Sequence, residues 1–264
     1  MLRTGRQGRT AMRFAPAHNR RSNAQSEVRN RWTTAILMWA DCLGEPLNSG
    51  ISRAQQNYAW MLRVSVLNAT AAQQPLFAVP NGIRAWQFDG INDALLAPLN
   101  FSGFGNPQAT TVLTLHNVSN VTSGMLSERS NNYTTSTEGW GLSATTTAGE
   151  SALRGNVGTS ARGWNAAQNV WKVRASVLDK SAPSGSEVTV YENGSLLSAF
   201  TLTTNSNNTN AYGGAINTYF GSRAGTSLPI NGYMAQAIVT MRAFTASEIA
   251  YLTQLMRWRA GFAV

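Results

Sequence analysis

The acidic side chains and the histidines limit the chemistry available to this chain. A glycosidase needs two carboxyl groups around one substrate, and carboxylates at alternating positions of a strand point to the same face of a sheet. The chain has four aspartates and eight glutamates, mostly isolated, with no Glu-x-Asp-x-x-Glu pattern, and Glu187 and Glu192 flank a turn. A Ser/His/Asp triad would need His18 or His116, and no Gly-x-Ser-x-Gly turn is present to hold a nucleophile. The sequence therefore predicts no catalytic residues and no enzyme.

Metal ligands are also scarce. Two histidines and one cysteine argue against a zinc site built by the protein. One turn gathers the oxygen ligands of Asp89, Asn92 and Asp93, which would suit a calcium ion. The stronger interpretation is that these side chains cap the turn through their own backbone. We predict no metal and, because no nucleotide-binding glycine loop is present, no cofactor.

Binding requires less than catalysis, since exposed aromatic rings, amides and backbone groups on loops can hold a sugar. Four aromatic residues lie near segments rich in Gly, Asn and Ser and are candidate glycan-binding residues: Tyr133, Trp140, Trp164 and Tyr212. The alternative is that each fills the core, which is where most tryptophans of a β-sandwich lie.

Positive charge is concentrated at the start of the chain. The first 35 residues hold eight arginines and a single glutamate, which accounts for seven of the nine net positive charges. The arginines are Arg3, Arg6, Arg9, Arg13, Arg20, Arg21, Arg29 and Arg31. Few apolar residues accompany them, so the segment cannot fold alone. We predict a basic extended arm over residues 1–32 that packs on other protein subunits; contact with nucleic acid and a merely solvated tail are the alternatives.

The rest of the chain, residues 33–264, has the pattern of one β-domain. Short β-like runs recur between turn signals: TTAILMWADCL from Thr33, then IRAWQFDG, ATTVLTLHNV, GWGLSATT, NVWKVRASVL, SEVTVYENGSLLSAFTL, NTYFGSR and YMAQAIVTMRAF. Repeated short strands are typical of an antiparallel sandwich or barrel. The stretch 44–67 gives no clear element.

Two local signals are sharper. Asn193-Gly194 supplies the two residues that a type I′ turn needs, so a hairpin is expected around it. Thr245-Ala-Ser-Glu248 is a capping box, and a helix is expected after it. Apolar residues follow at helical spacing: Ile249, Leu252, Leu255 and Met256. We expect this one short C-terminal helix to pack on an edge of the sandwich.

Several motifs, in order, resemble the concanavalin A-like lectin/glucanase superfamily, specifically its laminin-G-like domains in bacteriophage and bacterial surface proteins. They are WQFDGIND (86–93), YENG (191–194), FGSR (220–223), INGYMAQ (230–236) and AFTASEI (243–249). MWAD (38–41), NATA (68–71) and QP (74–75) look like the opening of the longer versions. The resemblance implies an all-β, antiparallel jelly-roll β-sandwich from about Thr33 to the end of the chain.

These expectations point to a binding or structural protein. The preferred hypothesis is a bacteriophage virion protein, either a capsid decoration or a tail or fibre component. Its sandwich would face outward and could bind cell-surface glycans, while its arm would anchor it to neighbouring virion subunits in a homo-oligomeric assembly. The alternatives are an exported bacterial carbohydrate-binding module and a jelly-roll coat protein whose arm contacts packaged nucleic acid. No secretory signal and no run approaching ~18 apolar residues is present, so we expect synthesis in a host cytoplasm, assembly into a virion and no membrane contact.

Overall fold

The computed structural model describes the β-domain that the sequence predicts. It covers residues 36–42, 57–58, 65–66, 71–102, 105–119, 124–130, 139–144, 150–153, 161–164, 168–183, 185–197, 201–202, 212–225 and 227–262. All of these belong to one unit of the chain, Thr34–Val264. The predicted basic arm and its eight arginines lie outside the described residues.

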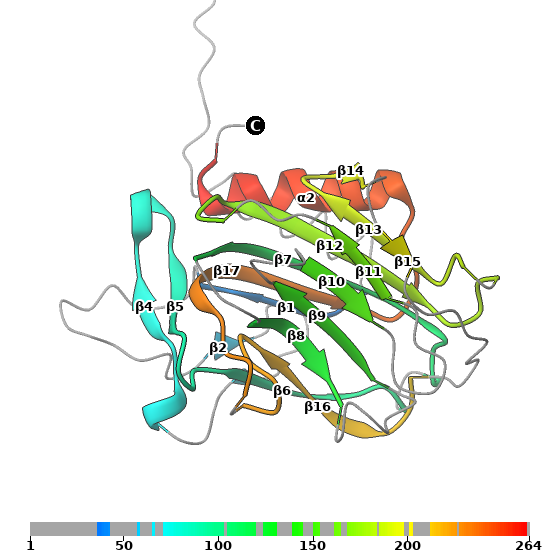
Figure 1. The fold of residues 1–264 in the computed structure, drawn as a ribbon, viewed down its shortest axis with the longest axis horizontal. Helices are drawn as coiled ribbons and strands as arrows, with labels where there is room; N and C mark the ends of the chain where they lie inside the picture. The colour runs from blue at the N-terminus through cyan, green and yellow to red at the C-terminus, as the bar shows by residue number, and fades with distance from the viewer. Residues whose placement is uncertain are drawn as a thin grey trace, which may run out of the picture. The chain divides into compact units, whose positions relative to one another are not determined.

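Two antiparallel sheets make up the domain (Figure 1). The eight-stranded sheet contains β1 (Ile36–Asp41), β4 (Leu76–Ala78), β5 (Ala85–Asp89), β7 (Ala109–Val118), β12 (Lys172–Asp179), β13 (Val188–Glu192), β14 (Ser195–Leu196) and β17 (Asn231–Thr240). The seven-stranded sheet contains β6 (Leu95–Asn100), β8 (Gly124–Arg129), β9 (Trp140–Ala144), β10 (Glu150–Leu153), β11 (Ala161–Trp164), β15 (Thr201–Leu202) and β16 (Ala215–Phe220). A separate pair joins β2 (Asn57–Tyr58) to β3 (Ser65–Val66). The predicted all-β sandwich with one short C-terminal helix is confirmed.

The strand order mixes distant parts of the chain. The eight-stranded sheet runs β14-β13-β12-β7-β17-β5-β4, with β1 also paired to β17, and the seven-stranded sheet runs β15-β11-β10-β9-β8-β16-β6. Successive side chains of a strand point to opposite faces, so each strand contributes alternate residues to the space between the sheets. In β6, for example, Leu95, Ala97 and Leu99 belong to the core.

The asparagine-glycine turn forms the predicted hairpin. Asn193 and Gly194 have φ angles of 49° and 87°, and Glu192 pairs with Ser195 across β13 and β14. Two consecutive positive φ angles give the backbone twist that a two-residue hairpin needs.

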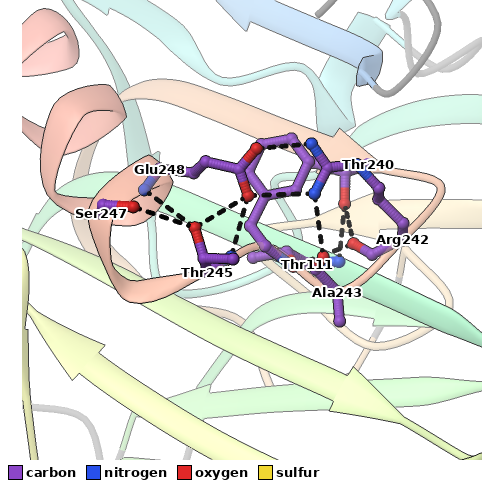
Figure 2. Close-up of polar contacts among 8 residues, drawn as sticks. Thr111, Thr240, Arg242, Ala243, Thr245, Ser247 and Glu248 are labelled. Carbon is purple, nitrogen blue, oxygen red and sulfur yellow. Dashed lines mark hydrogen bonds and ion pairs between the residues drawn. The ribbon is translucent and has the colours of Figure 1, made fainter.

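The predicted helix is also confirmed as α2 (Ala246–Ala260). Its N-cap is Thr245, whose side chain accepts a hydrogen bond from the Glu248 N–H while the Glu248 carboxylate accepts one from the Thr245 N–H. Figure 2 shows this capping box beside Arg242, whose guanidinium donates to both carboxylate oxygens of Glu248 at 2.6 and 3.0 Å. With 15 residues, α2 falls short of a membrane-spanning helix, and the described residues contain no other candidate span.

Helix α2 lies on the outer face of the eight-stranded sheet, where it contacts the edge strand β14, as expected, and also β12 and β17. The Gln236 side chain on central strand β17 donates to the Met256 carbonyl at 2.8 Å. Its cross-strand neighbour Leu115 is buried on the same outer face, as is Leu113 two residues away. The buried helix residues, including Ile249 and Leu252, supply the matching apolar surface. A second apolar layer therefore lies under α2, outside the main core.

The Glu248 carboxylate makes the stability of the domain sensitive to acid. Hydrogen bonds from Arg242 lower the pKa of Glu248 from 4.5 to about 2. A carboxyl group with a lowered pKa in the folded state stabilises the fold above pH 4.5, and this contribution disappears as the pH falls toward 2. Because Arg242 is 43% exposed, solvent screening reduces the contribution to about 1–2 kcal/mol at pH 7. We expect urea denaturation to show Glu248→Gln less stable than wild type by that amount at pH 7 and by a clearly smaller amount at pH 2.5. An equal difference at both pH values would contradict the role of the ionised carboxylate.

Candidate functional site

Two of the four predicted glycan-binding aromatics are wrong. Trp140 and Tyr212 are fully buried and form a triad with Phe101, with ring centroids 5.8 to 6.2 Å apart. Trp164 ends β11, but its side chain lies outside the described residues, as does all of Tyr133. The alternative interpretation, a place in the core, is the correct one for Trp140 and Tyr212.

Buried cations close off the faces of this triad. The Arg129 guanidinium lies 4.6 Å from the Phe101 ring centroid and donates to the carbonyl oxygens of Gly213 and Gly214 at 2.7 and 3.1 Å. The Lys180 ammonium lies 4.0 Å from the Tyr212 ring. Both cations are buried, and their contacts with ring faces stabilise charge that has left water. These contacts belong to the interior of the sandwich, where a sugar has no access.

The Asp89–Asp93 turn uses its oxygens as caps. Asp89 Oδ1 accepts the N–H groups of Ile91 and Asn92 at 2.7 and 3.3 Å, and Asp93 Oδ2 accepts the Asp89 N–H at 2.9 Å. This arrangement confirms the turn-capping interpretation. Within the described residues, no group of three or more His, Cys, Asp or Glu side chains could hold a metal ion.

The glutamates within the sandwich also have structural partners. Glu128 is buried, accepts hydrogen bonds from Ser130 Oγ at 2.7 Å and the Ala224 N–H at 3.2 Å, and pairs with Arg223. Burial raises the pKa of its carboxyl group above the ordinary value, and these contacts oppose that rise. Glu192 pairs with Arg174 at 2.6 Å. Each carboxylate holds a loop or a strand in place.

His116, a candidate member of a catalytic triad, lies inside the sandwich. It is fully buried and shares a hydrogen bond of 3.0 Å with Thr114 Oγ1. Its cross-strand neighbour on β12 is Lys172, and Met234 of the core lies opposite on β17. The surroundings fit an ordinary strand residue in a partly polar interior.

A different set of residues combines aromatic rings with amides at the surface. Tyr233 on β17 lies between Asn117 of β7 and Gln87 of β5 in the sheet register. Cross-strand neighbours share a face, and Tyr233 points opposite to core residue Met234, so all three lie on the outer face of the eight-stranded sheet. Trp171, just before β12, reaches the same place.

Ring contacts join Tyr233 and Trp171 to a third aromatic residue at the C-terminal end of α2. The Trp171 ring lies 6.3 Å from that of Tyr233 and 6.2 Å from that of Phe262, which follows the helix. These three rings are half-buried, as is Asn117, and Gln87 is exposed. We call Gln87, Asn117, Trp171, Tyr233 and Phe262 the outer-face cluster.

The outer-face cluster has the chemistry to bind a flat, hydroxyl-rich molecule. An aromatic ring offers apolar area with little conformational freedom to lose, and the Tyr hydroxyl adds a polar group. The side-chain amides of Gln87 and Asn117 each offer two donors and an acceptor. No carboxylate pair suitable for hydrolysis lies among them, so the arrangement suits binding.

Sequence reasoning missed the outer-face cluster although one signal was available. In the run NGYMAQAIV, strand alternation places Tyr233 opposite Met234 and therefore away from the core. The meeting of Tyr233 with Trp171 and Phe262 depends on sheet pairing between segments far apart in the chain, which no local pattern provides.

Comparison with solved structures gives matches of fold. The receptor-binding domain of botulinum neurotoxin D matches at a TM-score of 0.55 and 9% identity, over 86% of this chain and 54% of that chain. The binding domain of botulinum neurotoxin DC in complex with SialylT matches at 0.54 and 8% identity, over 86% and 52%. Domain 4 of the arabinanase AbnA from Geobacillus stearothermophilus, in complex with arabinotriose, gives 0.49 at 15% identity, over 68% and 81%.

These identities show the fold alone. The chain spans about half the length of the toxin chains it matches. By sequence, no protein-family model and no curated protein matches it. This likeness of fold agrees with the antiparallel β-sandwich that the sequence motifs predict.

Proposed function

We propose that this protein is a non-enzymatic, lectin-like binding protein that holds a saccharide on its outer-face cluster. The observation on which this rests is the cluster itself, in which the Trp171 ring contacts two other aromatic rings and two amides lie on the same outer face of the sheet. A pyranose ring offers an apolar C–H face for stacking and hydroxyls at its edge for the amides, so both parts of the cluster have a use.

The solved structures add support from similar folds. Cell entry of botulinum neurotoxin type C, whose structure matches at a TM-score of 0.52, depends on interaction with two ganglioside molecules. The binding domain of botulinum neurotoxin DC, which matches at 0.54, forms a complex with SialylT. We extend this class of ligand from these two toxins to this chain.

A glycan-binding measurement with matched variants tests this function. Trp171→Ala removes the central ring of the cluster, and we expect it to weaken binding to a glycan array hit by about tenfold or more, equivalent to about 1.4 kcal/mol. Tyr219→Ala removes a half-buried ring from β16 of the other sheet and serves as the control. If full-length protein binds no glycan, or both variants weaken binding equally, the outer-face cluster is not the site.

We propose further that the basic segment 1–32 anchors the sandwich to an assembly, as a capsid decoration or a tail or fibre component of a bacteriophage virion. Seven net positive charges lie in the first 35 residues, and β1 begins directly afterwards and is buried in the sheet. A segment attached there would be tied to a buried strand that pairs with β17.

Deleting residues 1–32 separates the anchoring hypotheses. We expect the shortened protein to stay folded and bind glycan but to be lost from particles in sedimentation. A full-length protein that binds polysaccharide columns and never sediments with particles would favour an exported carbohydrate-binding module. Retention on DNA or RNA that falls steeply with salt and disappears on deletion would favour a coat protein whose arm contacts nucleic acid.

A further inference from the structure

We infer that the outer-face cluster selects an acidic saccharide and that Arg257 binds its carboxylate; this inference rests on the proposed glycan-binding function. Arg257 lies in the last turn of α2, and its guanidinium carbon is 4.9 Å from the Phe262 ring centroid. Phe262 in turn contacts Trp171. The half-buried guanidinium therefore flanks the aromatic part of the cluster.

The charge of Arg257 has no carboxylate partner among the described residues. Its polar side-chain contact is a long one, 3.5 Å from Nη1 to Asn193 Oδ1. That oxygen already accepts the Val173 N–H at 3.0 Å. Three other arginines of the domain pair with glutamates: Arg174 with Glu192, Arg223 with Glu128 and Arg242 with Glu248. Arg257 differs from them, and its guanidinium lies beside the Phe262 ring of the cluster.

The Arg257 guanidinium lies over the Phe262 ring, and its chemistry suits carboxylate recognition. A guanidinium presents its N–H donors in its own plane, in a fork that matches the two oxygens of a carboxylate. A uronic or sialic acid ring on Trp171 and Tyr233 would bring such a carboxylate to the flank of the cluster. A lysine ammonium has the same charge without the fork.

Arg257 also has a structural role that the test must separate. It lies near the C-terminal end of α2, where a cation interacts favourably with the helix dipole. Arg257→Lys keeps that charge and removes the planar fork, whereas Arg257→Gln removes both. Thermal unfolding of the two variants reports the structural contribution independently of binding.

Calorimetric titration of the full chain in 150 mM salt tests the inference with charge-matched ligands. The probes are trigalacturonic acid against its methyl ester, and 3′-sialyllactose against lactose. We expect at least one acidic member to bind about tenfold more tightly than its neutral counterpart. Arg257→Gln should reduce that preference to near unity, Arg257→Lys should retain less than half of it, and Trp171→Ala should weaken binding of both members. Arg3→Gln, which removes one charge from the arm, is the control and should change nothing.

The outcomes distinguish carboxylate binding by Arg257 from the proposed glycan binding by the outer-face cluster. If wild type binds acidic and neutral members equally, Arg257 is not a carboxylate site and the glycan-binding function stands. If no probe binds and no glycan is found on an array, both fail. If Arg3→Gln lowers the preference as much as Arg257→Gln does, general positive charge explains it and the assignment to Arg257 is wrong.

Discussion

Gly221→Ala is expected to destabilise the sandwich by about 4 kcal/mol or more, a large part of the stability of an ordinary domain. A Cβ atom at Gly221 would lie 2.0 Å from Phe88 Cε1 and 2.4 Å from its Cδ1. Phe88 is fully buried in the core and has no free space to enter. The Gly221 backbone is held by hydrogen bonds to Leu126 and Ile230. Its φ of +89° adds strain for any residue with a side chain.

Gly82→Ala provides a matched control for that result. Gly82 has nearly the same φ, +81°, and a Cβ atom there would meet nothing within 4 Å. The free energy of unfolding of this variant should fall by about 1 kcal/mol, because of backbone strain alone. Thermal unfolding followed by circular dichroism compares the two. Equal melting temperatures would mean that Phe88 moves freely and that the close approach does not limit the fold.

The fold was predictable from the sequence where the signals are local. Asn193-Gly194 predicts its hairpin because few other residue pairs accept two positive φ angles. The capping box at Thr245 predicts the start of α2 because each of its side chains satisfies a backbone N–H that the helix leaves free. The β-like run ATTVLTLHNV predicts β7 to the residue.

The site was not predictable in the same way, because exposure is set by pairing between distant strands. Trp140 and Tyr212 lie among glycines and polar residues in the sequence, which favours a surface loop, yet both meet Phe101 in the core. Trp171 lies in a strand-like run that suggests burial, yet its ring is half-exposed at the sheet end. The composition around a residue in the sequence describes its local segment. It does not show which residues of the opposite sheet pack against that residue.

The position of β1 links the two proposed roles of the protein. Its residues pair with the second half of β17, and Trp39 Nε1 donates to the Gln236 side chain that also bonds to α2. The Arg259 guanidinium lies 5.5 Å from the Trp39 ring. β1 is the first strand after the basic segment, and these contacts tie it to the central strand β17 and to the helix α2. A pulling force on the segment would therefore be passed to both elements.

Extending the deletion from residue 32 to residue 41 is therefore expected to abolish folding. The longer deletion removes β1, in which five consecutive apolar residues from Ile36 to Ala40 are at most 2% exposed. Burial of a large apolar side chain contributes about 1.5–3 kcal/mol, so the total lost, about 10 kcal/mol, is comparable to the stability of an entire domain. It would also leave Gln236 without its bond to Trp39 and expose the paired edge of β17. We expect aggregated protein without a cooperative melting transition, whereas deletion of residues 1–32 should leave the melting temperature within a few degrees of the full chain. A cooperative transition in the longer deletion would show that the sheet closes without β1, and the anchoring segment would then be attached to a dispensable strand.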